Sequence, residues 1–170
     1  MGLFSFLKNA GTSLFGGKKA DPATPATPAA PSALDKLENA QMALRLTSHV
    51  TALGLKVTQL NITVDDDKAI ITGVAASQSD KEKVILAVGN VAGIASVDDK
   101  MTVAAAAATA VVEPESTFYT VESGDTLSKI AKSQYGNASK YQVIFEANKP
   151  MLKDADKIFP GQVLRIPKMA

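Results

Sequence analysis

The alternation of apolar and polar positions is clearest near the end of the chain, over residues 118–167. An aromatic and β-branched run opens this stretch at 118–121, and a second run at 162–166 closes it before Pro167. Such runs, bounded by turn residues, are typical of strands. Two short helical patterns lie between them, separated by Tyr135-Gly136-Asn137. The pattern predicts a strand, two helices and a strand.

A second patterned region begins with a helix and a hairpin. Residues 34–53 carry apolar side chains at helical spacing, and Gly54 favours a helix end at that point. Residues 60–64 and 70–74 alternate between apolar and polar, which predicts two strands. The acidic segment 65–68 is the turn that joins them, and it reads as a solvated turn because it lacks the ligand spacing of a calcium loop.

This region continues with a second helix and a last strand. Ser79-Asp80-Lys81-Glu82 fits a capping box and predicts the start of the helix. Gly89-Asn90 and Gly93 predict its end, and residues 96–103 read as the strand. Asp98-Asp99 is interpreted as a charged edge of that strand. The region is therefore helix, hairpin, helix, strand.

The remaining segments are a start and two linkers. Residues 1–16 carry apolar side chains near helical spacing, interrupted by glycines, which predicts an amphipathic terminal helix that docks on a neighbouring core. A helix on a membrane surface, or a segment that helps to form a site, are the alternatives. Residues 17–33 are rich in proline and alanine and predict an extended linker, and the alanine-rich stretch 104–116 predicts another.

Composition leaves little room for catalysis. The chain of 170 residues has no cysteine, which excludes disulfides, thiolate metal sites and cysteine nucleophiles. Its single histidine, His49, lies within the first predicted helix, so neither a histidine metal cluster nor a catalytic triad can form. We expect a surface or core-edge role for His49 and no enzymatic activity.

Charge and targeting signals bear on partners and location. The net charge is +1, and no segment is basic enough to indicate nucleic-acid binding. No window approaches the length of a membrane span, and the start of the chain lacks the pattern of a secretory signal. We expect a monomer in the cytoplasm with no transmembrane segment.

Residues 118–167 resemble a LysM module. The matching pieces include Tyr-Thr-Val at 119–121, Ser-Gly-Asp-Thr-Leu at 123–127, Ile-Phe-Glu-Ala-Asn at 144–148, and the run 160–167. The resemblance implies a shallow groove for glycans that contain N-acetylglucosamine, between the first strand-to-helix loop and the loop before the last strand. Its candidate residues are Gly124, Asp125, Thr126, Leu127, Ile158, Phe159, Pro160 and Gly161. Each of these residues also has an ordinary role in a cap, a turn or the core.

Residues 34–103 resemble a BON domain. The resemblance rests on the strand 69–74, the helix start at 79–88 and the loop Gly-Ile-Ala-Ser-Val at 93–97. The expected fold class is thus α+β, with two small domains and an N-terminal amphipathic segment. The expected boundaries are 1–16, 17–33, 34–103, 104–116 and 117–168.

The combination of a short apolar start, a BON domain and a LysM module is similar to a family of bacterial cytoplasmic potassium-binding proteins. The resemblance implies a potassium sensor or buffer that becomes more compact when the ion binds. Potassium is bound well by neutral backbone carbonyls, so the lack of an acidic or histidine cluster is compatible with it. The candidate carbonyl donors are Leu7, Ala10, Thr12, Gly89, Val91 and Ile94. The proline- and alanine-rich linker at 17–33 departs from the shorter charged connection expected of this family.

Two other functions stay open at this point. A glycan-binding envelope protein would act through the LysM module, and a scaffold would use both domains to bind proteins. Because nothing in the sequence indicates export, the potassium hypothesis leads.

Overall fold

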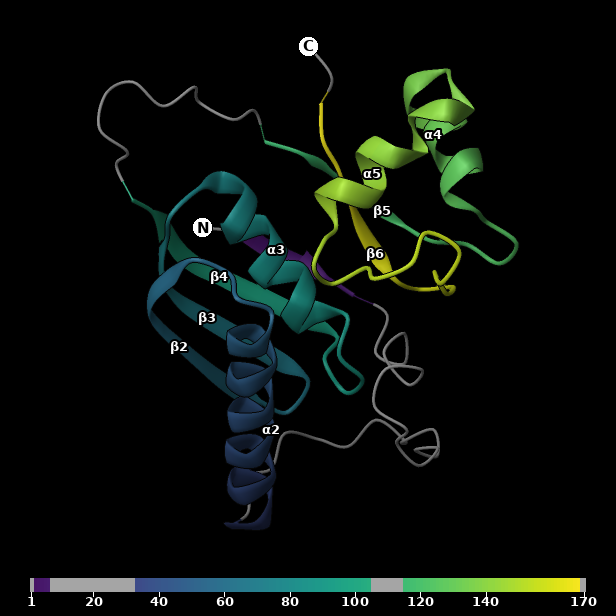
Figure 1. Ribbon diagram of the computed structural model, residues 1–170. Coiled ribbons are helices and arrows are strands. Elements are labelled where there is room, and N and C mark those ends of the chain that lie inside the picture. Colours follow the sequence, from purple (N-terminus) through teal and green to yellow (C-terminus); the bar gives the residue numbers. More distant parts are fainter. Residues whose placement is uncertain (1, 7–32, 105–114, 169–170) are drawn as a thin grey trace.

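The computed structural model describes residues 2–6, 33–104 and 115–168 (Figure 1). The secondary structure falls into two groups, each built around its own small sheet. The first group contains β1 (Gly2–Ser5), α2 (Ala33–Ala52), β2 (Val57–Asp65), β3 (Lys68–Ala75), α3 (Gln78–Gly89) and β4 (Ser96–Val103). The second contains β5 (Thr117–Thr120), α4 (Leu127–Tyr135), η1 (Ala138–Lys140), α5 (Tyr141–Ala147) and β6 (Val163–Ile166).

The first sheet has the strand order β1-β4-β3-β2. The β2–β3 hairpin is antiparallel, whereas β3 and β4 run parallel, with α3 as the connection between them. A parallel pair needs such a crossover because its strands start at the same end of the sheet. Both α2 and α3 cover one face of this sheet (Figure 1). The predicted order of helix, hairpin, helix and strand is confirmed.

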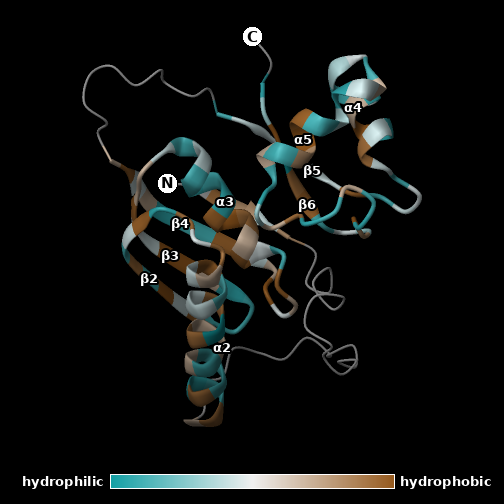
Figure 2. Ribbon diagram, in the orientation of Figure 1, coloured by the Kyte–Doolittle hydropathy of each residue, from teal (hydrophilic) through white to brown (hydrophobic). Residues whose placement is uncertain are grey.

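The core of the first group lies between the helices and that sheet face. Leu46 of α2, Ile71 of β3, Leu86 of α3 and Val97 of β4 are fully buried there. Hydrophobic residues recur along these strands and helices, coloured brown in Figure 2. Phe6 is the aromatic member of this cluster among the described residues, and Phe4 and Phe118 pack against it while partly buried.

The helical prediction for the start of the chain was wrong for residues 2–5. These residues form β1, which pairs antiparallel with β4 and places Phe4 opposite Val97. The exposure of residues 3–6 alternates, as in a strand. Leu3 is 66% exposed and Ser5 is exposed, whereas Phe4 is half-buried and Phe6 is buried. Pairing with β4 satisfies backbone groups that a four-residue helix in water could not satisfy, and it turns Phe4 and Phe6 inward.

Two further predictions in this domain need correction. The N-cap of α3 is Ser77, whose Oγ accepts a hydrogen bond from the Asp80 N–H at 3.0 Å, so the helix begins earlier than the Ser79 box predicted. Asp99 is not a charged strand edge: β4 lies inside the sheet, and Asp99 is 3% exposed. Its carboxylate is neutralised by Lys81, with the Nζ and Oδ2 atoms 2.9 Å apart.

The second group has the predicted order of strand, two helices and strand. β5 and β6 pair antiparallel, with Tyr119 opposite Leu164. Leu127, Ile130 and Ile144 fill the space between the helices and this two-stranded sheet. Thr126 is the N-cap of α4, and Gly136 ends the helix in the left-handed conformation, with φ of 71°.

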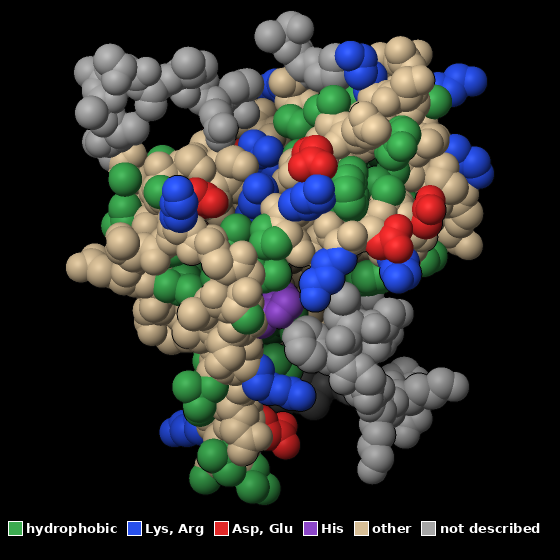
Figure 3. Space-filling model, in the orientation of Figure 1, with side chains coloured by type: hydrophobic (Ala, Val, Ile, Leu, Met, Phe, Trp, Pro, Cys, Tyr) green, Lys and Arg blue, Asp and Glu red, His purple; other side chains and the backbone are tan. Residues whose placement is uncertain are grey.

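The helices within the described ranges were searched for a membrane span, and none combines enough length with enough hydropathy to be one. The face shown in Figure 3 carries basic and acidic side chains interspersed, in keeping with the small net charge of +1.

Candidate functional site

The loop between α3 and β4 carries three of the residues predicted as carbonyl donors. α3 ends at Gly89, and the Asn90 N–H closes the helix on the Leu86 carbonyl at 3.0 Å. The side chains of Val91 and Ile94 are buried, which anchors the loop on the core. Because these side chains face the core, the polar groups that a ligand could meet at Val91 and Ile94 are those of the backbone.

The carbonyl oxygens of this loop are only partly used. Among hydrogen bonds within the described residues, none reaches the carbonyl of Gly89 or Ile94, and the Val91 carbonyl accepts one bond, from the Ile94 N–H at 3.2 Å. A carbonyl oxygen has two lone pairs, so Val91 keeps acceptor capacity. The negative end of the α3 dipole lies at the same place, and no basic side chain occupies the last turn of that helix. The loop is therefore suited to a cation.

The N-terminal segment reaches this loop through Phe6. Its backbone N–H donates to the Ala95 carbonyl at 2.8 Å, and its ring packs on Gly89. A Cβ atom added to Gly89 would lie 2.2 Å from the Phe6 ring, so only glycine permits this contact. Residue 6 thus lies directly at the end of α3. The other three predicted donors, Leu7, Ala10 and Thr12, lie outside the described residues.

Ionised ligands do not compete with these carbonyls. In the part of the chain that the structure describes, no group of three or more Asp, Glu, His or Cys side chains could hold a metal ion. Hard divalent cations favour carboxylates, whereas a weakly hydrated monovalent cation can be held by neutral carbonyl oxygens. The chemistry of the loop therefore matches the second kind of ion.

Asn90 connects this loop to the other domain, whereas its sequence context predicts only the end of a helix. Its side-chain Nδ2 donates to the Val163 carbonyl at 2.9 Å, and its Oδ1 accepts from the Val163 N–H at 2.8 Å. Asn90 is 7% exposed. Only the tertiary structure brings residue 90 beside residue 163, so no local pattern could have indicated this role.

A second set of contacts joins the domains near the start of α3. Arg165 of β6 pairs with Glu82, and the two side chains are 8% and 3% exposed. The Ser116 N–H donates to the same carboxylate at 3.1 Å, and Gln78 donates at 2.9 Å. The rings of Phe4 and Phe118 meet edge to face with centroids 5.3 Å apart. The domains are thus held by specific polar and aromatic contacts.

The environment of Glu82 keeps it charged. Burial alone raises the pKa of a carboxyl group, because it penalises the ionised form. Here the hydrogen bonds from Arg165, Gln78 and Ser116, together with the charge of Arg165, outweigh burial and leave the pKa of Glu82 below its ordinary value. The ion pair is therefore intact at neutral pH.

The residues predicted for glycan binding lie on two loops of the second domain. The loops are joined where the Gly161 N–H donates to the Val121 carbonyl at 2.8 Å. Asp125 accepts hydrogen bonds from the Tyr119 hydroxyl and the Glu122 N–H, both at 2.9 Å. Leu127 is 2% exposed and belongs to the core. Several of these residues thus have structural roles.

The remaining predicted glycan residues are more open. Gly124 and Thr126 are exposed, Ile158 and Phe159 are half-buried, and Pro160 is exposed. The Gly124 carbonyl accepts from the Lys129 Nζ at 2.8 Å, and Thr126 caps α4. A ligand on these loops would meet chiefly apolar side chains and backbone.

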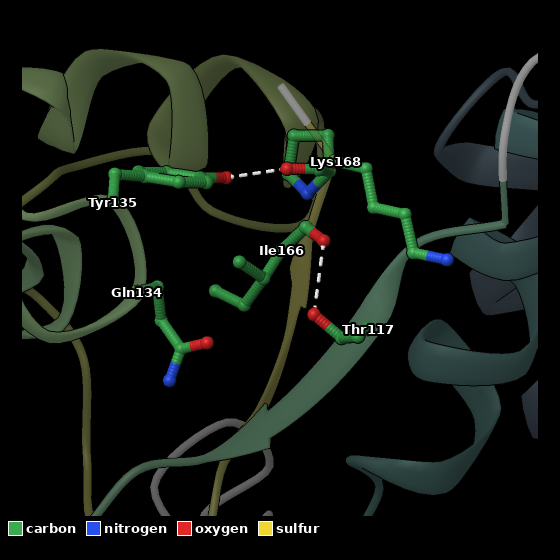
Figure 4. A pocket seen from close by; sticks show the side chains of 6 residues that line it. Thr117, Gln134, Tyr135, Ile166 and Lys168 are labelled. Carbon is green, nitrogen blue, oxygen red and sulfur yellow. Dashed lines mark hydrogen bonds between the residues drawn. The ribbon is translucent and has the colours of Figure 1, made fainter. Parts of the chain in front are cut away.

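The pocket shown in Figure 4 is a different surface of this domain. It has a volume of about 450 Å³ and is lined by Thr117, Gln134, Tyr135, Ile166, Pro167 and Lys168. The Tyr135 hydroxyl donates to the Pro167 carbonyl at 2.7 Å, and the Thr117 hydroxyl donates to the Ile166 carbonyl at 3.3 Å. Its hydroxyl groups are engaged in holding the end of β6, and it includes none of the predicted glycan residues.

Comparison with known proteins identifies both domains. Residues 39–105 match the model of the BON domain, and residues 119–167 match that of the LysM domain. A curated protein from Escherichia coli O6:H1, named "Potassium binding protein Kbp", is 47% identical over 169 residues, which cover 99% of this chain and 99% of that protein. The chain belongs to the family of that protein. It is thus a member of a two-domain family with BON and LysM domains, and its relative is named for binding, not for catalysis.

A second relative matches a shorter part of this chain. An uncharacterized protein from Deinococcus radiodurans is 49% identical over 51 residues, which are 30% of this chain and 19% of that protein. The name of that protein states no function.

Proposed function

We propose that this chain binds potassium through backbone carbonyls at the end of α3, with the N-terminal segment completing the site. The observation that carries the proposal is the placement of Phe6 on Gly89, at a loop where the Gly89 and Ile94 carbonyls accept no hydrogen bond from the described residues and the Val91 carbonyl accepts one. The near full-length relative named as a potassium binding protein supports the choice of ion. The proposed donors are Gly89, Val91 and Ile94, together with Leu7, Ala10 and Thr12 of the N-terminal segment.

The physical basis is replacement of the hydration shell of the ion. Several carbonyl dipoles can substitute for water around potassium, and the smaller sodium ion gains less from the same set of carbonyls. The negative end of the α3 dipole adds to the attraction. Because the donors come from segments far apart in sequence, binding orders them together, so the ion-bound chain is more compact. We propose a monomeric sensor or buffer of potassium in the cytoplasm.

The test compares potassium with sodium at matched ionic strength. Potassium chloride is expected to raise the melting temperature and reduce the radius measured by small-angle scattering, since a ligand that binds only the folded chain stabilises it. Sodium chloride is the control for ionic strength. Identical melting curves and scattering profiles in the two salts would contradict the proposal.

Glycan binding by the LysM domain is the second candidate. It is favoured by the family match over residues 119–167 and by the open surface at Gly124, Thr126 and Pro160. Co-sedimentation with purified peptidoglycan, with no response to potassium, would place this function first.

A further inference from the structure

Asn90 takes part both in the loop of proposed potassium donors and in the contact between the two domains. Its backbone lies between Gly89 and Val91, two of the proposed potassium donors, whereas its side chain lies against β6 of the other domain. α3 and β6 are neighbours in space (Figure 1). One residue therefore links the loop that offers carbonyls with the strand that ends the LysM fold.

The contact has the form of strand pairing. Asn90 takes both backbone polar groups of Val163, with distances of 2.8 and 2.9 Å. Asn148 does the same for Arg165, two residues further along β6, with both distances at 2.8 Å. The opposite edge of β6 pairs with β5. Two asparagine side chains thus complete the outer edge of this buried strand, Asn148 from its own domain and Asn90 from the BON domain.

These bonds fix the direction of the Asn90 side chain. If it turned away, the N–H and C=O of the buried residue Val163 would lose their partners, and buried unpaired polar groups are costly. The Asn90 N–H is also fixed by the carbonyls of Leu86 and Val88. Since the peptide unit is planar, an N–H that is held in place also holds the carbonyl of the preceding residue, Gly89.

We infer that Asn90 is a positioning residue for the ion: with its side chain fixed by the reciprocal hydrogen bonds to Val163, it orients the carbonyl of the preceding residue, Gly89, toward the cation. This inference rests on the proposed function. Asn90 is not itself among the proposed donors, and it acts through the peptide unit that it shares with Gly89. Its bonds to β6 make ion affinity depend on the edge of a strand in the other domain.

The test compares two substitutions that remove the same kind of contact. Asn90→Ala and Asn148→Ala each delete a pair of reciprocal hydrogen bonds to β6, so both full-length variants should melt at a lower temperature than the wild type. Only Asn90→Ala is expected to weaken potassium binding, by about tenfold in calorimetric titration, which lies within the usual range for coupled sites. Asn148→Ala should bind potassium within about twofold of the wild type. The hydrogen bonds that Asn148 makes to Arg165 lie within the second domain, away from the proposed donors, so their removal should lower stability without changing affinity.

The outcomes separate this inference from the proposed function. Absence of potassium binding by the wild type would reject the function and the inference with it. Binding by the wild type with the same affinity in Asn90→Ala, or with an equal loss in both variants, would overturn the positioning role and leave the function intact. Asn90→Gln, which moves the amide by one methylene, serves where the alanine variant does not fold. It should also bind potassium less tightly, and wild-type affinity in Asn90→Gln would overturn the inference.

Discussion

Gly89 is the residue at which the N-terminal strand meets the end of α3. Its missing Cβ leaves room for the Phe6 ring, 2.2 Å from the position that a Cβ would take. Gly89→Ala should therefore push the ring out of its site and destabilise the fold by about 1–3 kcal/mol, the usual cost of overpacking a core. Urea unfolding in potassium-free buffer measures this change.

The same substitution in a Phe6→Ala background provides the control. With the ring removed, alanine at position 89 meets no obstacle there and gains up to about 1 kcal/mol of helix propensity relative to glycine. Gly89→Ala should then be neutral or slightly stabilising. An equal destabilisation in both backgrounds would show that Phe6 is not the cause.

His49 gives the fold a dependence on pH. Its burial on α2, and then the positive charge of Lys153, lower the pKa of this imidazole in the folded chain. The unfolded chain therefore binds more protons than the folded chain as the pH falls through about 6.5 and below, so stability is lost in that window. The melting temperature should fall between pH 7.5 and 5.5, and it should fall less in His49→Gln. Equal slopes for the two proteins would contradict this account.

At the scale of elements, α3 depends on a cap that precedes the expected one. Ser77 accepts from the Asp80 N–H and also donates to the Asp80 carboxylate, at 3.0 Å in each case. Ser77→Ala should destabilise the chain by about 1 kcal/mol, the usual value for loss of an N-cap. Ser133→Ala, on the exposed face of α4, is the control and should stay within about 0.5 kcal/mol of the wild type. Chemical denaturation of both variants checks the difference, and equal effects would reject the cap.

The elements that could be predicted from the sequence are those whose signals are local. The strand predicted at 96–103 has the same bounds as β4. Its signals, the alternation of apolar and polar residues and the turn residues before it, come from neighbouring positions in the sequence. The strand β1 was missed because its partner lies far away in the chain, with Phe4 opposite Val97. Spacing in the first residues favoured a helix, and a strand is the better solution there only because β1 pairs with the edge of β4 that β3 does not cover.

The candidate site divides in the same way. Gly89, Val91 and Ile94 could be proposed because a helix end leaves carbonyls without partners, and the family resemblance pointed to that loop. Asn90 could not, because its role needs Val163, which the fold brings from the other domain. Glu82 was assigned to a helix cap, whereas its carboxylate binds Arg165, also across the interface. Contacts between domains were thus the part that sequence reasoning could not supply.

For the whole molecule, α3 is the element through which the two domains are connected. Its first half carries Glu82, which binds Arg165, and its end carries Asn90, which binds Val163. The two positions are eight residues apart, so about 12 Å of helix separates the contacts. Because both partners lie on one short strand, β6 is held at two points along α3, which restricts rotation between the domains. A substitution at either contact, Glu82 or Asn90, should therefore change the free energy of unfolding of the whole chain.

The buried ion pair between Glu82 and Arg165 tests this connection. Arg165→Met should destabilise the chain by about 3–5 kcal/mol, since it leaves the Glu82 carboxylate buried without its charged partner. The double variant Glu82→Gln/Arg165→Met should lose less than Arg165→Met alone, because no uncompensated charge stays in the interface. Urea unfolding followed by circular dichroism, which reports both domains, gives these differences. A double variant at least as unstable as Arg165→Met would argue that packing of the arginine, and not charge compensation, dominates.

Acid provides an independent check of the same pair. The pKa of Glu82 is lowered in the folded chain, so the carboxylate contributes stability that is complete above the ordinary pKa of glutamate, about 4.3, and is lost as the pH falls through the folded value. The wild type should therefore lose more stability between pH 6 and 3 than Glu82→Gln does, because glutamine does not titrate. Parallel curves for the two proteins would mean that the interface ion pair does not contribute to acid unfolding. Steeper loss in the wild type would tie the docking of the two domains to the charge of one carboxylate on α3.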